Sequence, residues 1–385
     1  MDFELNEDQR MFRRTLREFV DQEIIPVASE WEREGRYPEE IVEGFRRLGL
    51  FGVTVPEEYG GLDLDRVSFA LVFEEIARGW MGVAGVLGSH TLSAWMIARY
   101  GTDEQRAAYL PDLATGARRT GIALTEPGAG TDLQGIQTRA VRDGDEYVID
   151  GTKTWITNAR HADPLPVLVK TSIAEPPHKG MSVLLVDADR GFTVSRDLPK
   201  LGYKGTETCE VVFDGVRVPA SALLGGIEGR GMQQVLSALE LGRINIAARA
   251  VGVAQCAYEA ALNYSRERHA FGQPISGFQA VQLKLADLAT EIQAARLLTY
   301  WAADRSQAGA VNAEAAMAKY FASEVALRAT MESMRIHGGY GYSQEFVVER
   351  LYRDAPLMAI GEGTNDVQRM VIARALLSGA AKVGW

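Results

Sequence analysis

Cysteine is nearly absent from the sequence, which has only Cys209 and Cys256 in 385 residues. The pair forms no Cys-x-x-Cys motif and no disulfide framework, which indicates a reducing compartment. The five histidines are too widely spaced for His-Glu-x-x-His or another local metal-ligand pattern. The motifs of serine hydrolases and of phosphate-binding loops are also missing. We therefore predict no metal site and no hydrolytic triad.

The chain also has no excess of positive charge. It contains 51 acidic and 41 basic residues, which gives a net charge of −10. No Lys/Arg block resembles a nucleic-acid-binding tail. The N-terminal stretch MDFELNEDQRMFRR lacks the basic and apolar regions of a signal peptide. We expect a cytoplasmic protein with no nucleic-acid partner and no membrane span. The glycine-rich stretch 128–135 fails the Gly-x-Gly-x-x-Gly spacing, so a Rossmann site is not expected.

Three segments of different character are present. The first shows the amphipathic spacing of helices, with a capping-box pattern TDEQ at 102–105. The second contains short β-rich runs without intervening helices, and the third contains long helical patterns joined by glycine-marked loops. We predict an α+β fold with an N-terminal helical domain over 1–116, a middle antiparallel β domain over 117–227 and a C-terminal four-helix bundle over 228–385.

Local signals predict individual elements within these segments. The β-rich runs are RTGIAL, EYVIDGTKTWIT, PVLVKTS, MSVLLVD, GFTVSR and CEVVFDGVRVP. The dipeptides Asp150-Gly151 and Asp214-Gly215 are typical of hairpin turns. Long helices are expected over 232–268, 278–307, 312–336 and 364–378.

Two stretches of the middle segment have the chemistry to hold a planar, hydrogen-bonding ring. IALTEPGAGTD, 122–132, offers bare backbone N–H groups in a glycine-rich turn, although this stretch taken alone is more typical of a plain β-turn. In TKTWITNA, 152–159, the period of two places Trp155 and Thr157 on one face of a strand. The simpler alternative is a buried core tryptophan beside a surface threonine.

Three stretches of the last segment carry further candidates. RERHAFGQPISGFQAVQ, 266–282, places Arg268, Phe271 and Gln279 at a helix–helix turn that could clamp a pyrophosphate, or could be a solvated turn with Phe271 in the core. RIHGGYGY, 335–342, is a second glycine-rich break. Glu240 and Arg243 share one helical face, a spacing more typical of a surface ion pair than of a binding site.

A single carboxylate between two glycines, Glu362 in IGEGTNDVQR, is the most specific candidate for chemistry. Either it lies in a solvated turn, or the backbone is shaped so that one acid meets an apolar ligand. Asn365 and Gln368 have the spacing of a capping box for the following helix.

Taken together and in this order, the motifs resemble those of the acyl-CoA dehydrogenases. The matching stretches are VTVPEEYGG (53–61), ALTEPGAGTD (123–132), TWITN (154–158), RxxFGxPI (268–275), HGGYGY (337–342) and EGTxxxQR (362–369). The resemblance covers nearly the whole chain and implies a helical domain, a β domain and a four-helix bundle with FAD between them. It also implies a homo-oligomer, a tetramer or a dimer, with the flavin near a subunit interface.

The resemblance implies roles for particular residues. Glu362 would be the catalytic base that removes the α-proton of an acyl-CoA, while hydride passes from the β-carbon to flavin N5 and yields the trans-2-enoyl-CoA. The flavin itself would be held by Ile122, Leu124, Thr125, Thr131, Trp155, Thr157, Thr364 and Asp366. The adenine and pyrophosphate of a flavin in a neighbouring subunit would be held by Arg268, Ala270, Phe271, Phe278, Gln279, Arg335, Gly338 and Gly339. The acyl-CoA would lie along Thr131, Glu240, Arg243, Gly363 and Arg374.

At several positions this chain differs from residues that are found in members of the family. Some relatives place the base just before Arg243, where this chain has Gly242. Gly361 stands where many members have Tyr, Arg335 where Gln is common, and Ala270 where a hydroxyl residue is found. The expected reaction is dehydrogenation of a short or branched acyl-CoA with electron transfer to an electron-transfer flavoprotein. A flavin oxidase or monooxygenase of the same fold, and a dehydrogenase of acyl-carrier-protein thioesters, remain as alternatives.

Overall fold

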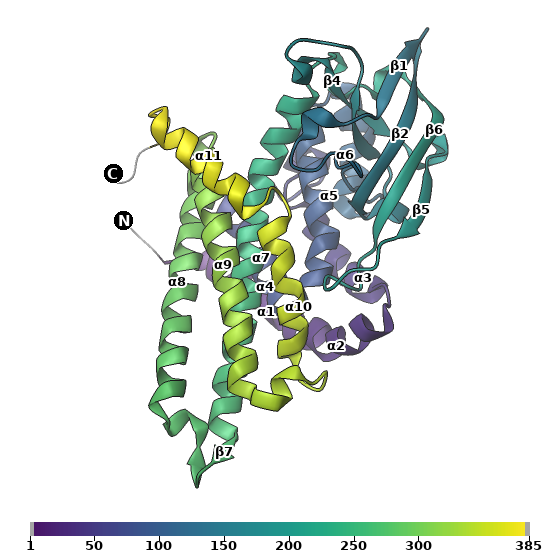
Figure 1. Ribbon diagram of the computed structural model, residues 1–385. Coiled ribbons are helices and arrows are strands. Elements are labelled where there is room, and N and C mark those ends of the chain that lie inside the picture. The colour runs from purple at the N-terminus through teal and green to yellow at the C-terminus, as the bar shows by residue number, and fades with distance from the viewer. Residues whose placement is uncertain (1–3, 382–385) are drawn as a thin grey trace.

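The computed structural model describes residues 4–381, so the outermost residues of the first and third predicted domains lie outside it. A bundle of long helices and a twisted β-sheet lie side by side, with helices of the N-terminal segment packed against both (Figure 1). The predicted α+β architecture is therefore confirmed.

The N-terminal segment is helical, as predicted. Its capping boxes form at Asn6/Gln9 and at Thr102/Gln105, and Gly116 ends the last helix at φ 74°. A π-helical turn over Val20–Ile24 joins the first two helices. The helices are α1 (Glu7–Phe19), α2 (Ile25–Glu34), α3 (Glu39–Arg47), α4 (Arg66–Gly79), α5 (Met81–Tyr100) and α6 (Asp103–Thr115).

Helix α5 is long and apolar enough to cross a membrane, judged by length and composition alone. The sequence analysis overlooked this segment. Most of the helix is buried within the protein, between α4, α6 and the long helix α7 (Gly231–Glu267), and a core helix passes the same test. The composition of α5 is therefore weak evidence for a membrane span.

The middle segment forms a six-stranded sheet in the order β4-β3-β1-β2-β6-β5. All neighbouring strands are antiparallel except β1 and β3, so the predicted pattern holds with one parallel contact. The segment RTGIAL forms only isolated bridges to this sheet. The strands are β1 (Arg139–Asp143), β2 (Glu146–Thr157), β3 (Leu165–Lys170), β4 (Met181–Val186), β5 (Thr193–Asp197) and β6 (Thr208–Pro219).

The two predicted hairpin turns are wrong. Asp150-Gly151 lies within β2 and Asp214-Gly215 lies within β6, where the two strands pair around an irregularity in the register. The tight turn that joins β1 to β2 lies instead at Gly144, with φ 63°. Bulges use glycine for the same backbone freedom as turns do, so the dipeptides alone could not separate the two.

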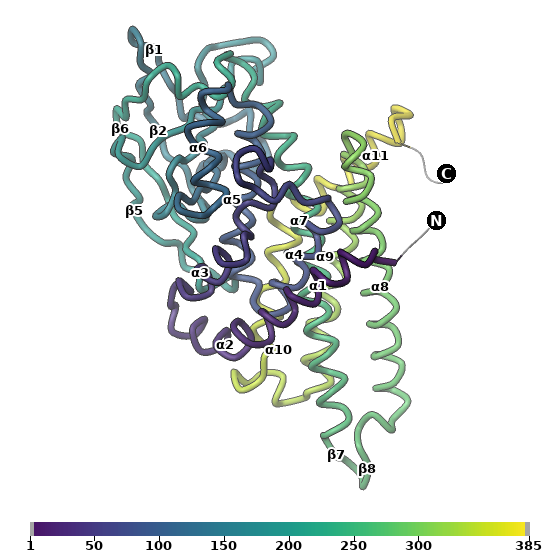
Figure 2. Tube along the Cα trace, turned by 180° about the vertical axis from the view of Figure 1, so that it is seen from behind, coloured from purple at the N-terminus to yellow at the C-terminus, as the bar shows by residue number. Residues whose placement is uncertain are grey.

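The C-terminal segment contains the bundle. The helices are α7, α8 (Gln279–Ala308), α9 (Asn312–His337), α10 (Val347–Ile360) and α11 (Asn365–Leu377), and the short strands β7 (His269–Ala270) and β8 (Gln273–Pro274) connect α7 to α8. Sequence analysis missed α10, which carries Pro356 in its interior. Figure 2 shows the β7–β8 turn at the far end of the bundle from the sheet.

Candidate active site

The candidate base lies in a tight connection between α10 and α11. Gly361 ends α10 with φ −67°, whereas Glu362 and Gly363 follow with φ values of 57° and 86°. Only Gly363 therefore needs glycine for its backbone, because Gly361 has a conformation that any residue adopts. Glu362 itself occupies the left-handed region, which is uncommon for a side chain of this kind and typical of functional sites.

Buried polar side chains hold this connection in place. Lys319 of α9 is fully buried, and its Nζ donates to the Ala359 carbonyl (3.2 Å), the Gly363 carbonyl (2.9 Å) and Asn365 Oδ1 (2.9 Å). Gln368 Nε2 donates to the carbonyls of Glu362 and Gly363 at 3.1 and 2.9 Å. The predicted capping by Asn365 is wrong, because Thr364 is the N-cap and accepts from Val367 N.

Replacing Lys319 by methionine should destabilise the protein by roughly 2–4 kcal/mol, because buried carbonyl acceptors lose their donors. We expect a lower unfolding midpoint in urea or on heating. Lys179→Met, at an exposed lysine, is the control and should leave the midpoint unchanged. Equal midpoints for the two variants would show that Lys319 does not hold the connection.

The Glu362 carboxylate points at α7 and α5. A Cβ atom added at Gly242 would lie 2.3 Å from Glu362 Oε2 and 2.9 Å from Leu92 Cδ2. Oε2 is buried and has no hydrogen-bond partner among the described residues. An unpartnered carboxylate oxygen in the interior is costly, and such groups call for a functional explanation.

Burial is the main influence on this carboxylate. It raises the pKa of Glu362 above the usual 4.5, while the positive charges of Arg249, Arg243 and Lys319 oppose that rise. Burial likewise lowers the pKa of Lys319, to about 8. A glutamate with a raised pKa near an apolar ligand suits a general base, because it holds a proton more strongly than an exposed one.

Glu240 and Arg243 do not form the surface ion pair considered from the sequence. Glu240 Oε1 accepts from the backbone N–H of Val311 at 2.9 Å, and Arg243 Nη1 donates to Asn312 Oδ1 at 2.8 Å. Arg243 is buried. Both side chains therefore bind the α8–α9 connection, and Arg243 adds positive charge beside Glu362.

The structure brings together the two stretches of the middle segment. The carbonyl of Thr125 accepts from Thr154 N at 2.9 Å, directly beside Trp155. A buried ion pair, Lys153 Nζ to Glu126 Oε1 at 2.9 Å, anchors the glycine-rich turn to β2. The other residues expected around the flavin differ in exposure: Leu124 is buried, Ile122 and Thr157 are half-buried, and Thr131 is exposed.

Trp155 is not a core residue, since 57% of it is exposed and its φ is 63°. The register of β2 against β6 shifts between Lys153 and Ile156, so the tryptophan lies at an irregularity of the strand. Next along the chain, Asn158 Nδ2 donates to the Val86 carbonyl at 2.8 Å and ties this end of β2 to α5. An open indole face therefore lies at the junction of the sheet and α5.

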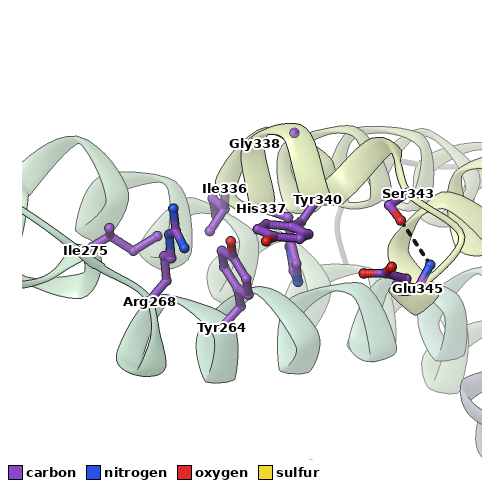
Figure 3. Close-up of a pocket in the computed structure, with 10 residues that line it drawn as sticks. Tyr264, Arg268, Ile275, Ile336, His337, Gly338, Tyr340, Ser343 and Glu345 are labelled. Carbon is purple, nitrogen blue, oxygen red and sulfur yellow. Dashed lines mark hydrogen bonds between the residues drawn. The ribbon is translucent and has the colours of Figure 1, made fainter.

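A second candidate site lies at the far end of the bundle. It is a pocket of about 620 Å³ lined by the ends of α7 and α9 and the turn after α9, with Arg268, Gly338 and Gly339 among its residues (Figure 3). The Arg268 guanidinium lies 5.9 Å from the Tyr340 ring centre. Tyr264 stacks on His337 at 4.2 Å.

Other residues expected to hold the adenine and pyrophosphate lie near the β7–β8 connection and the end of α9. Phe271 is 95% exposed rather than buried in the core, and its ring meets Phe278 edge to face at 6.0 Å. Gln279 begins α8 and is exposed, and the half-buried Ala270 lies in β7. Arg335 is paired with Glu332.

Two further predicted site residues, Asp366 and Arg374, lie on α11, and both are exposed.

These two groups of residues lie far apart in one chain. Helix α7 has 37 residues and is thus roughly 55 Å long. Gly242, beside Glu362, and Arg268, at the end of α7, are separated by on the order of 40 Å along that helix. The residues expected to hold the two ends of a flavin are therefore not brought together within one chain.

Sequence analysis missed three buried polar residues of this region, Lys319, Asn245 and Arg249, and considered Gln368 only as part of a helix cap. Each is buried. Lys319 was detectable, because the residues three or four positions away on α9 are small and form a buried stripe. Arg249 was likewise a charged residue within a run of alanines on a long helix.

Comparison with known proteins agrees with this architecture. Three family models match: the N-terminal domain of acyl-CoA dehydrogenases over 6–117, the middle domain over 121–216 and the C-terminal domain over 229–377. A probable acyl-CoA dehydrogenase, YngJ of Bacillus subtilis, is 45% identical over 98% of this chain and 100% of its own. A (2S)-methylsuccinyl-CoA dehydrogenase of Cereibacter sphaeroides is 42% identical over 97% of this chain and 70% of its own.

Solved structures are equally similar. Butyryl-CoA dehydrogenase from Megasphaera elsdenii superposes with a TM-score of 0.94 at 38% identity, covering 98% of this chain and 100% of that one. A chain from the structure of the electron transferring flavoprotein of Acidaminococcus fermentans reaches 0.95 at 39% identity, with coverage of 98% and 100%. A glutaryl-CoA dehydrogenase from Mycobacterium smegmatis in complex with FADH2 reaches 0.91 at 31% identity, with coverage of 98% and 97%.

The chain belongs to the acyl-CoA dehydrogenase family. Members of this family are FAD-dependent flavoproteins, and the protein is an oxidoreductase that acts on acyl-CoA.

Proposed function

We propose that the protein dehydrogenates a short acyl-CoA, straight or branched, to the trans-2-enoyl-CoA, with Glu362 as the base. The observation that carries the proposal is the Glu362 carboxylate, whose Oε2 is buried, unpartnered among the described residues and aimed between α5 and α7. Its raised pKa suits removal of the weakly acidic α-proton. The proton passes to the carboxylate oxygen, and FAD, when bound, accepts the hydride from the β-carbon.

The residues present fit a flavin. The exposed indole of Trp155 offers an aromatic face, and the half-buried Thr157 and the glycine-rich turn after Thr125 offer hydroxyl and backbone donors next to it. Ile122, Leu124, Thr131, Thr364 and Asp366 remain proposed contacts of the same cofactor. Gly363 would place its backbone near the thioester, with Glu240, Arg243 and Arg374 toward the CoA.

We further propose a homo-oligomer in which each flavin is shared between subunits. Support comes from the separation of on the order of 40 Å along α7 between the base and the second pocket. One FAD cannot span that distance, so the pocket with Arg268, Gly338 and Gly339 would receive the adenine and pyrophosphate of a partner's flavin. Its exposed Phe271 would then be covered by that partner.

Electrons would then pass to an electron-transfer flavoprotein. The similarity to a chain from the structure titled for such a flavoprotein supports this acceptor. The names of two relatives, butyryl-CoA dehydrogenase and methylsuccinyl-CoA dehydrogenase, support short substrates.

Anaerobic titration of the purified yellow protein with a panel of acyl-CoAs tests the proposal. The absorbance of the oxidised flavin should fall with one class of acyl-CoA and recover when an electron-transfer flavoprotein is added. A yellow protein that no acyl-CoA bleaches would favour a carrier-bound thioester or the oxygen-using alternative. A protein that binds no FAD would overturn the assignment.

A further inference from the structure

A group of buried polar side chains lies beyond Glu362 between α5 and α7. Arg249 is 5% exposed and Asn245 is 1% exposed. Both face Gly88 of α5, because a Cβ at that glycine would lie 1.8 Å from Arg249 Nη2 and 3.2 Å from Asn245 Nδ2. Gly88 therefore leaves the space that the guanidinium group occupies.

These side chains have no protein partners that would explain their burial. Within the described part of the chain, Asn245 Nδ2, Asn245 Oδ1 and Arg249 Nε are buried without a hydrogen bond. The cation–π contact of Arg249 with Phe73, at 5.6 Å, leaves its N–H donors unused. Buried polar groups that are left unsatisfied destabilise the folded protein, so a ligand that satisfies them is the physical explanation.

The arginine is not simply the counterion of the base. Among residues 4–381, Glu362 Oε2 and Arg249 Nε have no hydrogen-bond partner, although the positive charge of Arg249 lowers the pKa of Glu362 against the effect of burial. Arg243 and Lys319 supply two more positive charges around the same carboxylate, and Glu240 is the other acid close to Arg243. Glu324 lies near Lys319 in the same way, so Arg243 and Lys319 each have a second acid nearby, whereas Arg249, whose Nε is buried without a partner among the described residues, is left to bind a further carboxylate.

The position of this group matches the far end of a short acyl chain. Arg249 lies two helical turns beyond Gly242 on the same face of α7, on the order of 10 Å along the axis. Its side chain leans back toward the N-terminus of the helix, which brings the guanidinium closer to Glu362. On α5, Leu92 lies beside Gly242 and Gly88 lies one turn further along.

The hydroxyl of Tyr203 adds a third polar group at this end. It lies where a Cβ of Gly85 would be, one turn of α5 beyond Gly88. The Tyr203 backbone is fixed by a 2.6 Å hydrogen bond to Asp354 Oδ1 and has a positive φ of 58°. A purely apolar acyl terminus would leave the arginine, the asparagine and this hydroxyl facing a methyl group.

We propose that the substrate is a short dicarboxylyl-CoA, whose terminal carboxylate is bound by Arg249 and Asn245. This inference rests on the proposed function and adds the class of substrate to it. The reaction stays the same: the α C–H bond gives its proton to Glu362, the β C–H bond gives its hydride to FAD, and a C=C bond forms. The terminal carboxylate remains attached and ionised, so no C–C bond breaks.

Matched pairs of CoA esters test the assignment. Valeryl-CoA and glutaryl-CoA, and butyryl-CoA and succinyl-CoA, have equal numbers of acyl carbons and differ only in a terminal methyl or carboxylate group. Affinity is measured by calorimetry on the FAD-loaded Glu362→Gln protein, which binds without turnover. Glutaryl-CoA or succinyl-CoA should bind roughly 10- to 100-fold more tightly than its partner, the factor typical of charge-assisted hydrogen bonds.

The variant Arg249→Met in the same background should abolish or reverse that preference, and Arg249→Lys should keep part of it. Arg266→Met, at an exposed arginine near the end of α7, is the matched control and should change nothing. If Arg249→Met does not fold, the affinities of the ester pairs for the Glu362→Gln protein still decide whether a terminal carboxylate is preferred.

The outcomes separate this inference from the proposed function. Equal affinity within each pair, or preference for the methyl-terminated ester, overturns the dicarboxylyl assignment. If butyryl-CoA then bleaches the flavin of the wild-type protein, the proposed dehydrogenase function still stands. If no CoA ester binds or bleaches the flavin, both proposals fall.

Discussion

Replacing Glu362 by glutamine should reduce dehydrogenation by roughly 10²- to 10⁴-fold, the range in which a positioned general base contributes. Glutamine keeps the size of the side chain and its place beside Gly242 but cannot take the α-proton. The variant should remain yellow, because the residues proposed to hold the flavin are unchanged. The measurement is the rate of flavin bleaching under anaerobic single-turnover conditions.

A pH profile distinguishes a base from a merely structural residue. In the wild type the bleaching rate should rise with pH as the carboxylate loses its proton, with a midpoint above the 4.5 of an ordinary glutamic acid, because burial raises the pKa of Glu362. That acidic limb should vanish in the Glu362→Gln protein. Glu58→Gln, at an exposed glutamate, is the control and should keep both rate and profile. A Glu362→Gln rate within a factor of a few of wild type would refute the assignment.

Replacing Gly242 by alanine should lower the rate of proton removal about 100-fold with little loss of stability. The added methyl group would lie 2.3 Å from Glu362 Oε2 and 2.8 Å from its Cδ. Leu92 Cδ2 would also lie 2.9 Å from the methyl group, but this atom and the carboxylate are both ends of flexible side chains, so they should move aside without unfolding the protein. A displacement of about 1 Å at a reacting group can cost on the order of 10²-fold.

A double-mutant cycle separates this effect from general disturbance of α7. Glu362→Asp shortens the base and leaves room for the methyl group. Gly242→Ala should therefore slow the Glu362→Asp protein far less than it slows the wild type, because neighbouring residues are not additive. Bleaching rates and unfolding midpoints of the four proteins are compared. Equal slowing in both backgrounds would contradict a direct contact between residue 242 and the base.

Much of the fold could be predicted from local patterns. The long helices α7, α8 and α9 have continuous proline-free periodicity, and most strands coincide with β-rich runs. The wrong predictions also came from local patterns. Helix α10 was missed, and it carries Pro356 in its interior. Two Asp-Gly dipeptides indicated turns, but they lie at an irregularity within the paired strands β2 and β6. A dipeptide cannot distinguish a turn from a bulge without the register of its partner strand.

The candidate site could be predicted only in part. Glu362 stood out because one acid lies between two glycines, and its identity as the base came with a family resemblance. Trp155 and Phe271 were open alternatives, and burial decides both: each ring is exposed rather than part of the core. The sites themselves remain proposals that the variants above test.

The sequence by itself determined the order of helical and β segments, the ordered motifs and the choice of Glu362, because these depend on neighbours along the chain. The tertiary structure decided which distant residues meet. It placed Gly242 against the carboxylate, Lys319 beneath its loop and Arg249 over Gly88. It also placed Arg268 at the far end of α7 from Glu362. Helix packing sets such contacts, because the sequence period shows which face is buried but not which residue it will touch.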